Sequence, residues 1–564
     1  MSPSLPPRRA LPIALAMILC TSLPAFAQQV IADGDDQTPA AGDYQTSEPV
    51  EPGNPAGHVF HALNGGTIVP VGEVNLRTGG MRAAAVRVEG AGSHVALTGG
   101  SIVTTGYSAA GVSIASGGSA VLTGTRIETE GQASVGVGLE GGALEASNLH
   151  IITRGGLGHG VSVRGGDVQL RDSVIETHNS ASGLVVSDGT LLAERVRLEQ
   201  NTSGSAVKLD FAGNARATLR DVQINGTAAG ASGVSSGLGS QLLLQNVDIN
   251  LTHERSGAGL LVGGDVEFRG GRIHAAGDNA SVVSFATGGG GSLLLDDVVM
   301  DGTWGIGLRT GSSLEMRNSR LEAEKSGIDL GMAGGEAWVE NSTLHVRNGW
   351  GVSVQGNSRV DVHASAITTG GDQNPAVGVT EGAATLSETT LHTTGMYAHA
   401  LHTFGNNATA PTITATRIEA VTEGESAYGA TARKGGSVHL ADSVVRTRGQ
   451  KAHGVLADGR GELSLTATQV ITEGEGAWAA AIVEGGSLRI DGSALISQQH
   501  GGVWVRGSRD PGLTLANGAL VSGGNGIGLA LDAAVAGRFD VVLQGGSQMV
   551  GDIVITPEDE DAGL

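Results

Sequence analysis

The sequence predicts an all-β fold: a right-handed, single-stranded parallel β-helix (a solenoid) of about 20 coils, with about 25 residues per coil. Three observations lead to this prediction: short stretches of alternating apolar and polar residues, frequent glycine corners, and an internal repeat. Alternation is typical of half-buried strands, and glycine supplies the positive φ that sharp corners need. Glycine accounts for 93 of the 564 residues, well above its average share of roughly 7%.

One unit of the repeat covers residues 158–177. Apolar and polar residues alternate over 161–163 and again over 168–170, and the glycine pair 165–166 lies between these two stretches. A second corner leads to a third strand, whose inward residue is Ile175. Because one such coil cannot bury its inward face alone, the pattern must repeat along the chain.

The inward apolar residue of the third strand marks the repeat. Its mean spacing from Ile102 to Met549 is near 24.8 residues, with extremes of 21 and 29. A period this regular favours a solenoid, which grows along one axis instead of dividing into several domains. The markers are Leu76, Ile102, Ile127, Ile151, Ile175, Leu198, Ile224, Ile249, Ile273, Met300, Leu321, Leu344, Ile367, Leu391, Ile418, Val445, Val470, Leu495, Leu520 and Met549.

Residues 1–27 are predicted to be a secretory signal peptide. The pair Arg8-Arg9 precedes an apolar run over 11–23, and a small-x-small cleavage motif ends at Ala27. We therefore expect cleavage between Ala27 and Gln28, and export through the inner membrane. The only cysteine of the chain lies inside this signal, so we expect no disulfide bond in the mature protein.

The rest of the chain divides by composition. Residues 28–57 carry several carboxylates and four prolines but no lysine or arginine, which predicts an acidic, disordered leader. Residues 58–556 are predicted to form the β-helix, and 557–564 form an acidic tail. No later segment has the composition of a linker, so a single β-helical domain is expected.

Charge and motifs argue against several functions. The formal net charge is −22, and no cluster of lysine and arginine is present for a phosphate backbone to bind. We expect no nucleic-acid partner, no cofactor and no metal. Motif-like patterns are explained more simply as coil corners or strand positions: Gly136–Gly141 (dinucleotide-like), Gly233–Gly237 (nucleophile elbow), His392, His399 and His402 (metal), and Asp296, Asp297 and Asp301 (paired carboxylates).

One column of residues is a candidate binding strip. The residue that precedes the first strand of a coil is often large or aromatic, and successive coils place this position on one edge of the rod. Exposed aromatic residues at a repeated position are typical of an interaction surface. The alternative is that the rings stack on one another and only cover a corner. The strip comprises His159, Trp304, Trp350, Tyr428, His453 and Trp478, with His399 at the same place.

The chain resembles the passenger domain of pertactin-type autotransporters, a family of β-helical adhesins. The signal peptide, the absence of disulfides, coil phrases such as 160–166 and 351–356, and the closing phrase 543–554 carry this resemblance. It implies a virulence-associated adhesin displayed at the surface of a Gram-negative bacterium. Members of the family end in a translocator barrel, and no such stretch follows residue 556. We therefore expect the outer membrane to be reached through a missing or separate barrel.

Two functions remain after these observations. The first is a non-enzymatic, monomeric adhesin, at the cell surface or secreted, that binds a host-cell receptor or matrix component, whether protein or glycan. The second is a β-helical polysaccharide lyase or glycoside hydrolase that acts on acidic polysaccharides. The short, regular coils leave no room for the long corner insertions that build a catalytic groove, which favours the adhesin. A periplasmic location is the alternative to surface display.

Overall fold

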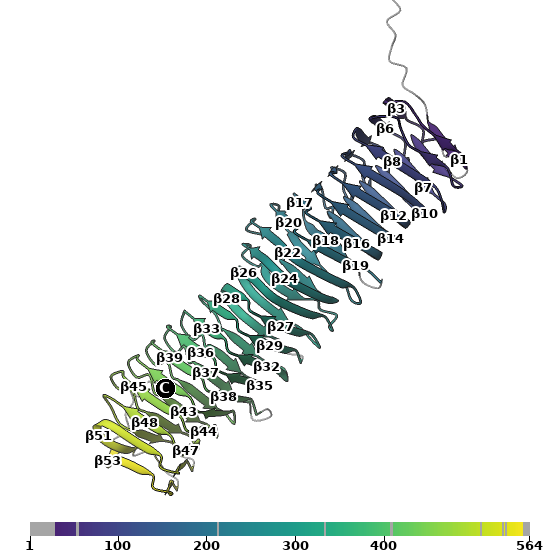
Figure 1. Cartoon of the computed structure of the whole chain (residues 1–564). Coiled ribbons are helices and arrows are strands. Elements are labelled where there is room, and N and C mark those ends of the chain that lie inside the picture. The colour runs from purple at the N-terminus through teal and green to yellow at the C-terminus, as the bar shows by residue number, and fades with distance from the viewer. Residues whose placement is uncertain are drawn as a thin grey trace, which may run out of the picture.

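The computed structural model describes residues 29–51, 56–210, 214–331, 334–406, 410–507, 510–532, 535 and 538–556. Within these ranges the chain forms 53 strands and no helix, and the strands follow one another along a long rod (Figure 1). No described helix could therefore cross a membrane. The predicted cleavage site at Ala27 and Gln28 and the acidic tail 557–564 lie outside the described residues.

The rod is a parallel β-solenoid of about 19 coils with about 25 residues each, which confirms the predicted fold class. Each coil contributes to three faces. In one coil, the first face holds the start of β14 (Val161–Arg171), the second face holds its end, and the third face holds β15 (Val174–Thr177). The described pairings are parallel and join each strand to its counterpart one coil away, as Val137, Val161 and Leu184 illustrate.

The predicted repeat markers form one column on the third face. Successive pairings place all of them opposite one another except Ile418 and Leu520, where the column passes through Ala420 and Val521 instead. Ile418 is also buried, two residues before the true position. Since residues two apart share a face, alternation alone cannot separate them.

The predicted disordered leader is wrong for residues 29–51, which form the first coil. Its three strands pair in parallel with those of the next coil. Among the described residues the β-helix therefore begins at Val30 and not at residue 58. The paired strands are β1 (Val30–Asp33), β2 (Asp36–Gln37) and β3 (Gly42–Thr46), and their partners are β4 (Phe60–Leu63), β5 (Thr67–Ile68) and β6 (Val74–Thr78).

A few inward side chains are enough to hold this first coil in place. Ala32 and Tyr44 are buried, and the Tyr44 ring lies 5.2 Å from the ring of Phe60 in an edge-to-face arrangement. The Asp33, Asp35 and Asp36 side chains point to solvent. A segment with few apolar residues is normally disordered, which is why the average composition predicted disorder here. A coil of a solenoid needs only a few apolar residues, because the next coil covers its inward face.

Buried threonines fasten the corner between the third face and the next coil. In each case the threonine hydroxyl donates a hydrogen bond to the carbonyl oxygen five residues later, inside the corner. A buried carbonyl without a donor would cost free energy, so each hydroxyl replaces a backbone partner that the sharp turn removes. The pairs are Thr104–Ala109, Thr129–Ser134, Thr369–Asn374, Thr393–Ala398, Thr422–Ala427, Thr447–Ala452 and Thr472–Ala477.

Replacing one of these hydroxyls should open the corner locally. Thr447 is fully buried, and its Oγ1 lies 2.6 Å from the Ala452 carbonyl oxygen. We expect Thr447→Val, which keeps the shape but leaves that carbonyl unpaired, to destabilise the coil by about 1–3 kcal/mol. Hydrogen exchange of the amides around 447–455 measures the change. The exposed Thr414 on β38 (Thr412–Thr416) supplies the control Thr414→Val. Equal effects of the two variants would contradict this role.

Candidate binding groove

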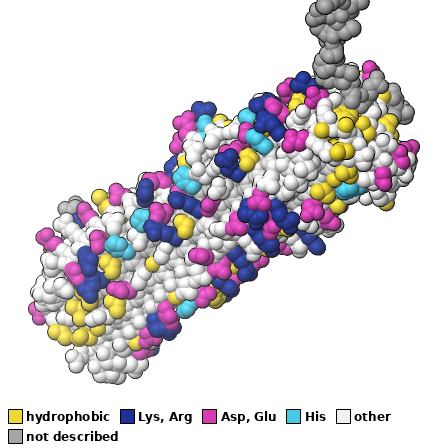
Figure 2. Space-filling view, turned by 45° about the horizontal axis from the view of Figure 1, so that its top comes forward, with side chains coloured by type: hydrophobic (Ala, Val, Ile, Leu, Met, Phe, Trp, Pro, Cys, Tyr) yellow, Lys and Arg dark blue, Asp and Glu magenta, His cyan; other side chains and the backbone are white. Residues whose placement is uncertain are grey.

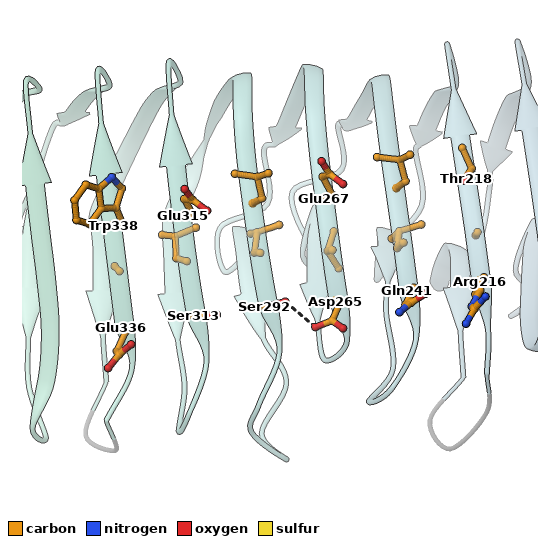
Figure 3. A pocket seen from close by; sticks show the side chains of 18 of the residues that line it. Arg216, Thr218, Gln241, Asp265, Glu267, Ser292, Ser313, Glu315, Glu336 and Trp338 are labelled. Atoms are coloured by element: carbon orange, nitrogen blue, oxygen red, sulfur yellow. Dashed lines mark hydrogen bonds between the residues drawn. The ribbon is translucent and has the colours of Figure 1, made fainter.

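An open groove lies on the second face of the rod. It has a volume of about 1100 Å³ and crosses the second-face strands of seven successive coils, so its long axis follows the rod (Figure 3). The strands are β19 (Arg216–Arg220), β22 (Gln241–Leu251), β24 (Asp265–Ala275), β26 (Ser292–Leu308), β27 (Ser313–Arg317), β29 (Glu336–Glu340) and β32 (Ser358–His363).

Two rows of outward side chains line the groove. In each strand, two residues that are two positions apart point to solvent, and the residue between them points into the core. The parallel register places the same positions of successive strands side by side, so that they form rows. We call these the edge row and the central row. The edge row is Arg216, Gln241, Asp265, Ser292, Ser313, Glu336 and Arg359. The central row is Thr218, Leu243, Glu267, Leu294, Glu315, Trp338 and Asp361.

The central row alternates between apolar and acidic residues from one coil to the next. The row begins at Thr218, and from there each apolar member, Leu243, Leu294 and Trp338, is followed by a carboxylate in the next coil. Trp338 is 45% exposed, which is unusual for the largest apolar side chain. It also borders a second hollow of about 470 Å³ that continues the groove towards Thr385. Trp338 is therefore the largest apolar side chain of this surface, and it lines both hollows.

The groove is acidic in its middle. Asp265, Glu267, Glu315 and Glu336 lie between Arg216 at one end and Arg359 with Asp361 at the other. Partners of these groups come from the same strand or from the next one: Arg269 pairs with Glu267, Arg317 pairs with Glu315, Arg359 pairs with Asp361 at 3.0 Å, and the Ser292 hydroxyl donates to Asp265 at 2.7 Å.

These ion pairs are exposed and therefore weak. Exposed pairs contribute about 0–1 kcal/mol each, since water and salt screen them. The Asp361 carboxylate raises the pKa of Arg359, through a hydrogen bond and its negative charge. Figure 2 shows basic and acidic side chains intermixed along the visible face of the rod. Because the ion pairs in the groove are weak, a charged ligand could displace one member of a pair at a small cost in free energy.

Most side chains of the predicted aromatic strip are not exposed. Ser281, Trp304 and Ser326 are register partners, and Trp304 is 39% exposed. His159 and Trp350 are half-buried. Towards the C-terminal end the exposed fraction is 3% for Tyr428, 2% for His453 and 8% for Trp478. The expectation of exposure is wrong for these three residues, and binding by the strip stays a prediction.

The buried part of the strip forms a stack. The Tyr428 ring lies 4.9 Å from the His399 ring and 5.0 Å from the His453 ring, with planes nearly parallel. The Tyr428 ring belongs to a second apolar cluster, separate from the main core, that also contains Leu456, Trp478 and Trp504. Covering these outer apolar groups removes them from water, which favours a folded-back ring over an exposed one.

The other candidate residues remain apart from the groove. Asp297 occupies a corner with a φ of 58°, and Asp301 lies on the third face, paired with Arg272 at 2.8 Å and with His274. The rings of His399 and His402 are 5.5 Å apart. Among the described residues no group of three or more histidine, cysteine and acidic side chains could hold a metal ion.

Sequence reasoning missed Trp338. The search for exposed aromatic residues followed the position before the first strand, whereas Trp338 lies at the centre of a second-face strand. The signal was the alternation within Glu336–Glu340, which places Ala337 and Val339 inward and the tryptophan outward. Its neighbours in the row could only be identified once the register was known.

Comparisons with known proteins support no specific activity. No protein-family model matches the sequence, and no curated protein matches it. A chain of the cryo-EM structure of the Vag8–C1 inhibitor complex is 16% identical, with a TM-score of 0.38, and the match covers 90% of this chain and 99% of that chain. A mutant of the PL6 family alginate lyase AlyGC is 8% identical, with a TM-score of 0.20, and the match covers 94% and 97%.

Similarity at these levels carries no functional argument. The fold is established by the strand register of this chain itself. The resemblance to pertactin-type passengers, a β-helical family, agrees with that fold.

The histidine stack should make the C-terminal half sensitive to acid. Burial lowers the pKa of His453 to about 3. Its Nδ1 accepts a hydrogen bond from the Trp478 amide at 3.1 Å, and its buried Nε2 has no partner in the described structure. The unfolded chain takes up the proton near pH 6.5 and the folded chain does not. Stability is therefore fully present above pH 6.5 and is lost as the pH falls towards 3.

We expect His453 alone to make the free energy of unfolding about 2 kcal/mol smaller at pH 5 than at pH 7. Urea unfolding followed by tryptophan fluorescence at the two pH values measures the loss. His453→Phe keeps a ring in the stack and should reduce the difference between the two pH values. The variant His439→Gln, at an exposed site of β41 (Ser437–Ala441), should leave that difference unchanged. An unaltered pH dependence in His453→Phe would contradict the assignment.

Proposed function

We propose that this protein is a non-enzymatic adhesin that is exported to the bacterial surface or secreted. In this proposal a host-cell receptor or matrix component binds along the side of the rod. The observation that carries the proposal is the open groove on the second face, with the exposed Trp338 as its largest apolar side chain. Large aromatic residues that remain exposed beside apolar and charged groups are the usual energetic centres of binding surfaces.

The form of the groove supports binding over catalysis. It extends along seven coils and is open to solvent. Figure 3 shows its lining side chains on successive strands that lie side by side. Catalytic sites usually bury their substrate and hold reacting groups in a dry cavity. The rod instead offers a long surface of outward side chains. Such a surface suits an extended partner that is held at many weak points.

The charge of the groove disfavours the alternative of a lyase or hydrolase for acidic polysaccharides. Five carboxylates line it and only two arginines do. A polyuronate would meet like charges over most of its length, which costs free energy unless cations intervene. Incubation of the full chain with acidic polysaccharides tests this alternative. New reducing ends or unsaturated products would replace the adhesin proposal with an enzymatic one.

Adhesion should depend on Trp338. We expect Trp338→Ala to weaken binding of the full chain to cultured cells or matrix proteins by about tenfold or more, because truncation of a central aromatic residue typically costs over 1 kcal/mol. Binding of fluorescent chain to cells, titrated to saturation, measures the affinity. Tyr107→Ala is the matched control, because Tyr107 is an exposed aromatic residue that lines neither the groove nor the predicted strip. Equal binding by Trp338→Ala and the unaltered chain would contradict the proposal.

Surface location is a separate prediction. Protease treatment of intact cells that express the native gene, followed by immunoblotting for the rod, should remove the signal. A periplasmic marker should survive the same treatment. A rod that stays protected in intact cells and is degraded only after the outer membrane is opened would place the protein in the periplasm instead. Adhesion by the exported form would then not occur.

A further inference from the structure

The central row of the groove has a repeat of two coils. Leu243, Leu294 and Trp338 recur at every second coil, and an acidic residue, such as Glu267 or Glu315, occupies the coil between them. Neighbouring parallel strands lie about 4.8 Å apart. Because the apolar residues of this row occur at every second coil, successive apolar residues are about 9.6 Å apart along the rod axis. A partner that uses all three apolar sites must therefore repeat with nearly the same period.

One common polypeptide conformation has this period. A polyproline II helix rises about 3.1 Å per residue with three residues per turn, so every third side chain returns to the same side after about 9.3 Å. An extended strand returns after about 6.7 Å, and an α-helix has a pitch of about 5.4 Å. Only the polyproline II period stays in phase with the three apolar sites over the length of the groove.

The chemistry of the two rows fits such a helix. Proline-rich helices bind to grooves lined by aromatic and apolar side chains, and they lose little entropy because they are already ordered. Trp338 and the two leucines offer three such contacts. Lysine or arginine on the intervening residues would reach Glu267, Glu315 and the edge-row carboxylates. The exposed Arg269 and Arg317 that now pair with the two glutamates are weakly held and can give way.

We propose that the groove binds a proline-rich, basic polypeptide segment in the polyproline II conformation, aligned with the rod axis. Seven coils span about 29 Å, which accommodates about nine residues of such a helix. The charge of the partner complements the acidic middle of the groove. This inference rests on the proposed adhesive function and names the chemistry of the partner.

The test compares two peptides of about twelve residues and identical composition. One repeats Pro-Pro-Lys, and the other contains the same residues in an order without a period of three. Fluorescence anisotropy with the full chain should show about tenfold tighter binding of the periodic peptide, because only its side chains match successive sites. Binding should weaken as salt is added, since the ion pairs are exposed. Equal affinity for the two peptides would overturn the proposal.

Variants locate the binding. Trp338→Ala should reduce affinity for the periodic peptide by about tenfold, and Glu315→Gln should reduce both the affinity and its salt dependence. Tyr107→Ala serves as the control and should change neither. If Trp338→Ala abolishes adhesion to cells while neither peptide binds, the adhesive function stands and the polyproline II partner is wrong. A neutral linear glycan that binds in a Trp338-dependent way, where the peptides do not, would likewise overturn the polyproline II partner alone. Failure of both adhesion and peptide binding would overturn both proposals.

Discussion

The pairing of each strand with its counterpart one coil away is the interaction on which this rod depends. A single coil leaves its backbone amides and carbonyls without partners and its apolar face in water. The next coil supplies both, and the parallel register then places like positions above one another, from Tyr44 near the start to Met549 near the end. Inward rows become the core and outward rows become the surface. The groove is a direct product of that register.

Much of the fold could be predicted from the sequence because spacing and alternation report on the register. The column through Ile102 and Ile127 follows from a period near 25 and a strand alternation of two. Ile418 was misplaced because a second inward position lies two residues from the true one. The first coil was missed because its charged outward residues dominate the average composition, whereas the few inward ones, such as Tyr44, hold it to the next coil.

The candidate site was harder to predict because exposure depends on neighbours from other coils. Trp304 and Tyr428 occupy the same type of position, yet one is exposed and the other buried. Leu456 and Trp504 lie on the outer face near Tyr428, and the Tyr428 ring packs in one apolar cluster with them. The strands beside Trp304 present Ser284 and Gly307 at the corresponding outer positions, so its ring has little apolar surface to cover. The identity of an aromatic residue and its place in the repeat cannot distinguish these environments.

The two-coil alternation of the groove has a consequence for how such rods can change over evolution. Gain or loss of one whole coil leaves the core intact, because inward rows are alike from coil to coil. The outer rows are not alike: removal of the coil that carries Glu315 would bring Leu294 next to Trp338. Insertion or deletion of coils in pairs preserves the phase, whereas an odd number inverts it. The count of coils, and not only the residues in them, therefore determines the order in which apolar and acidic side chains follow one another along the surface.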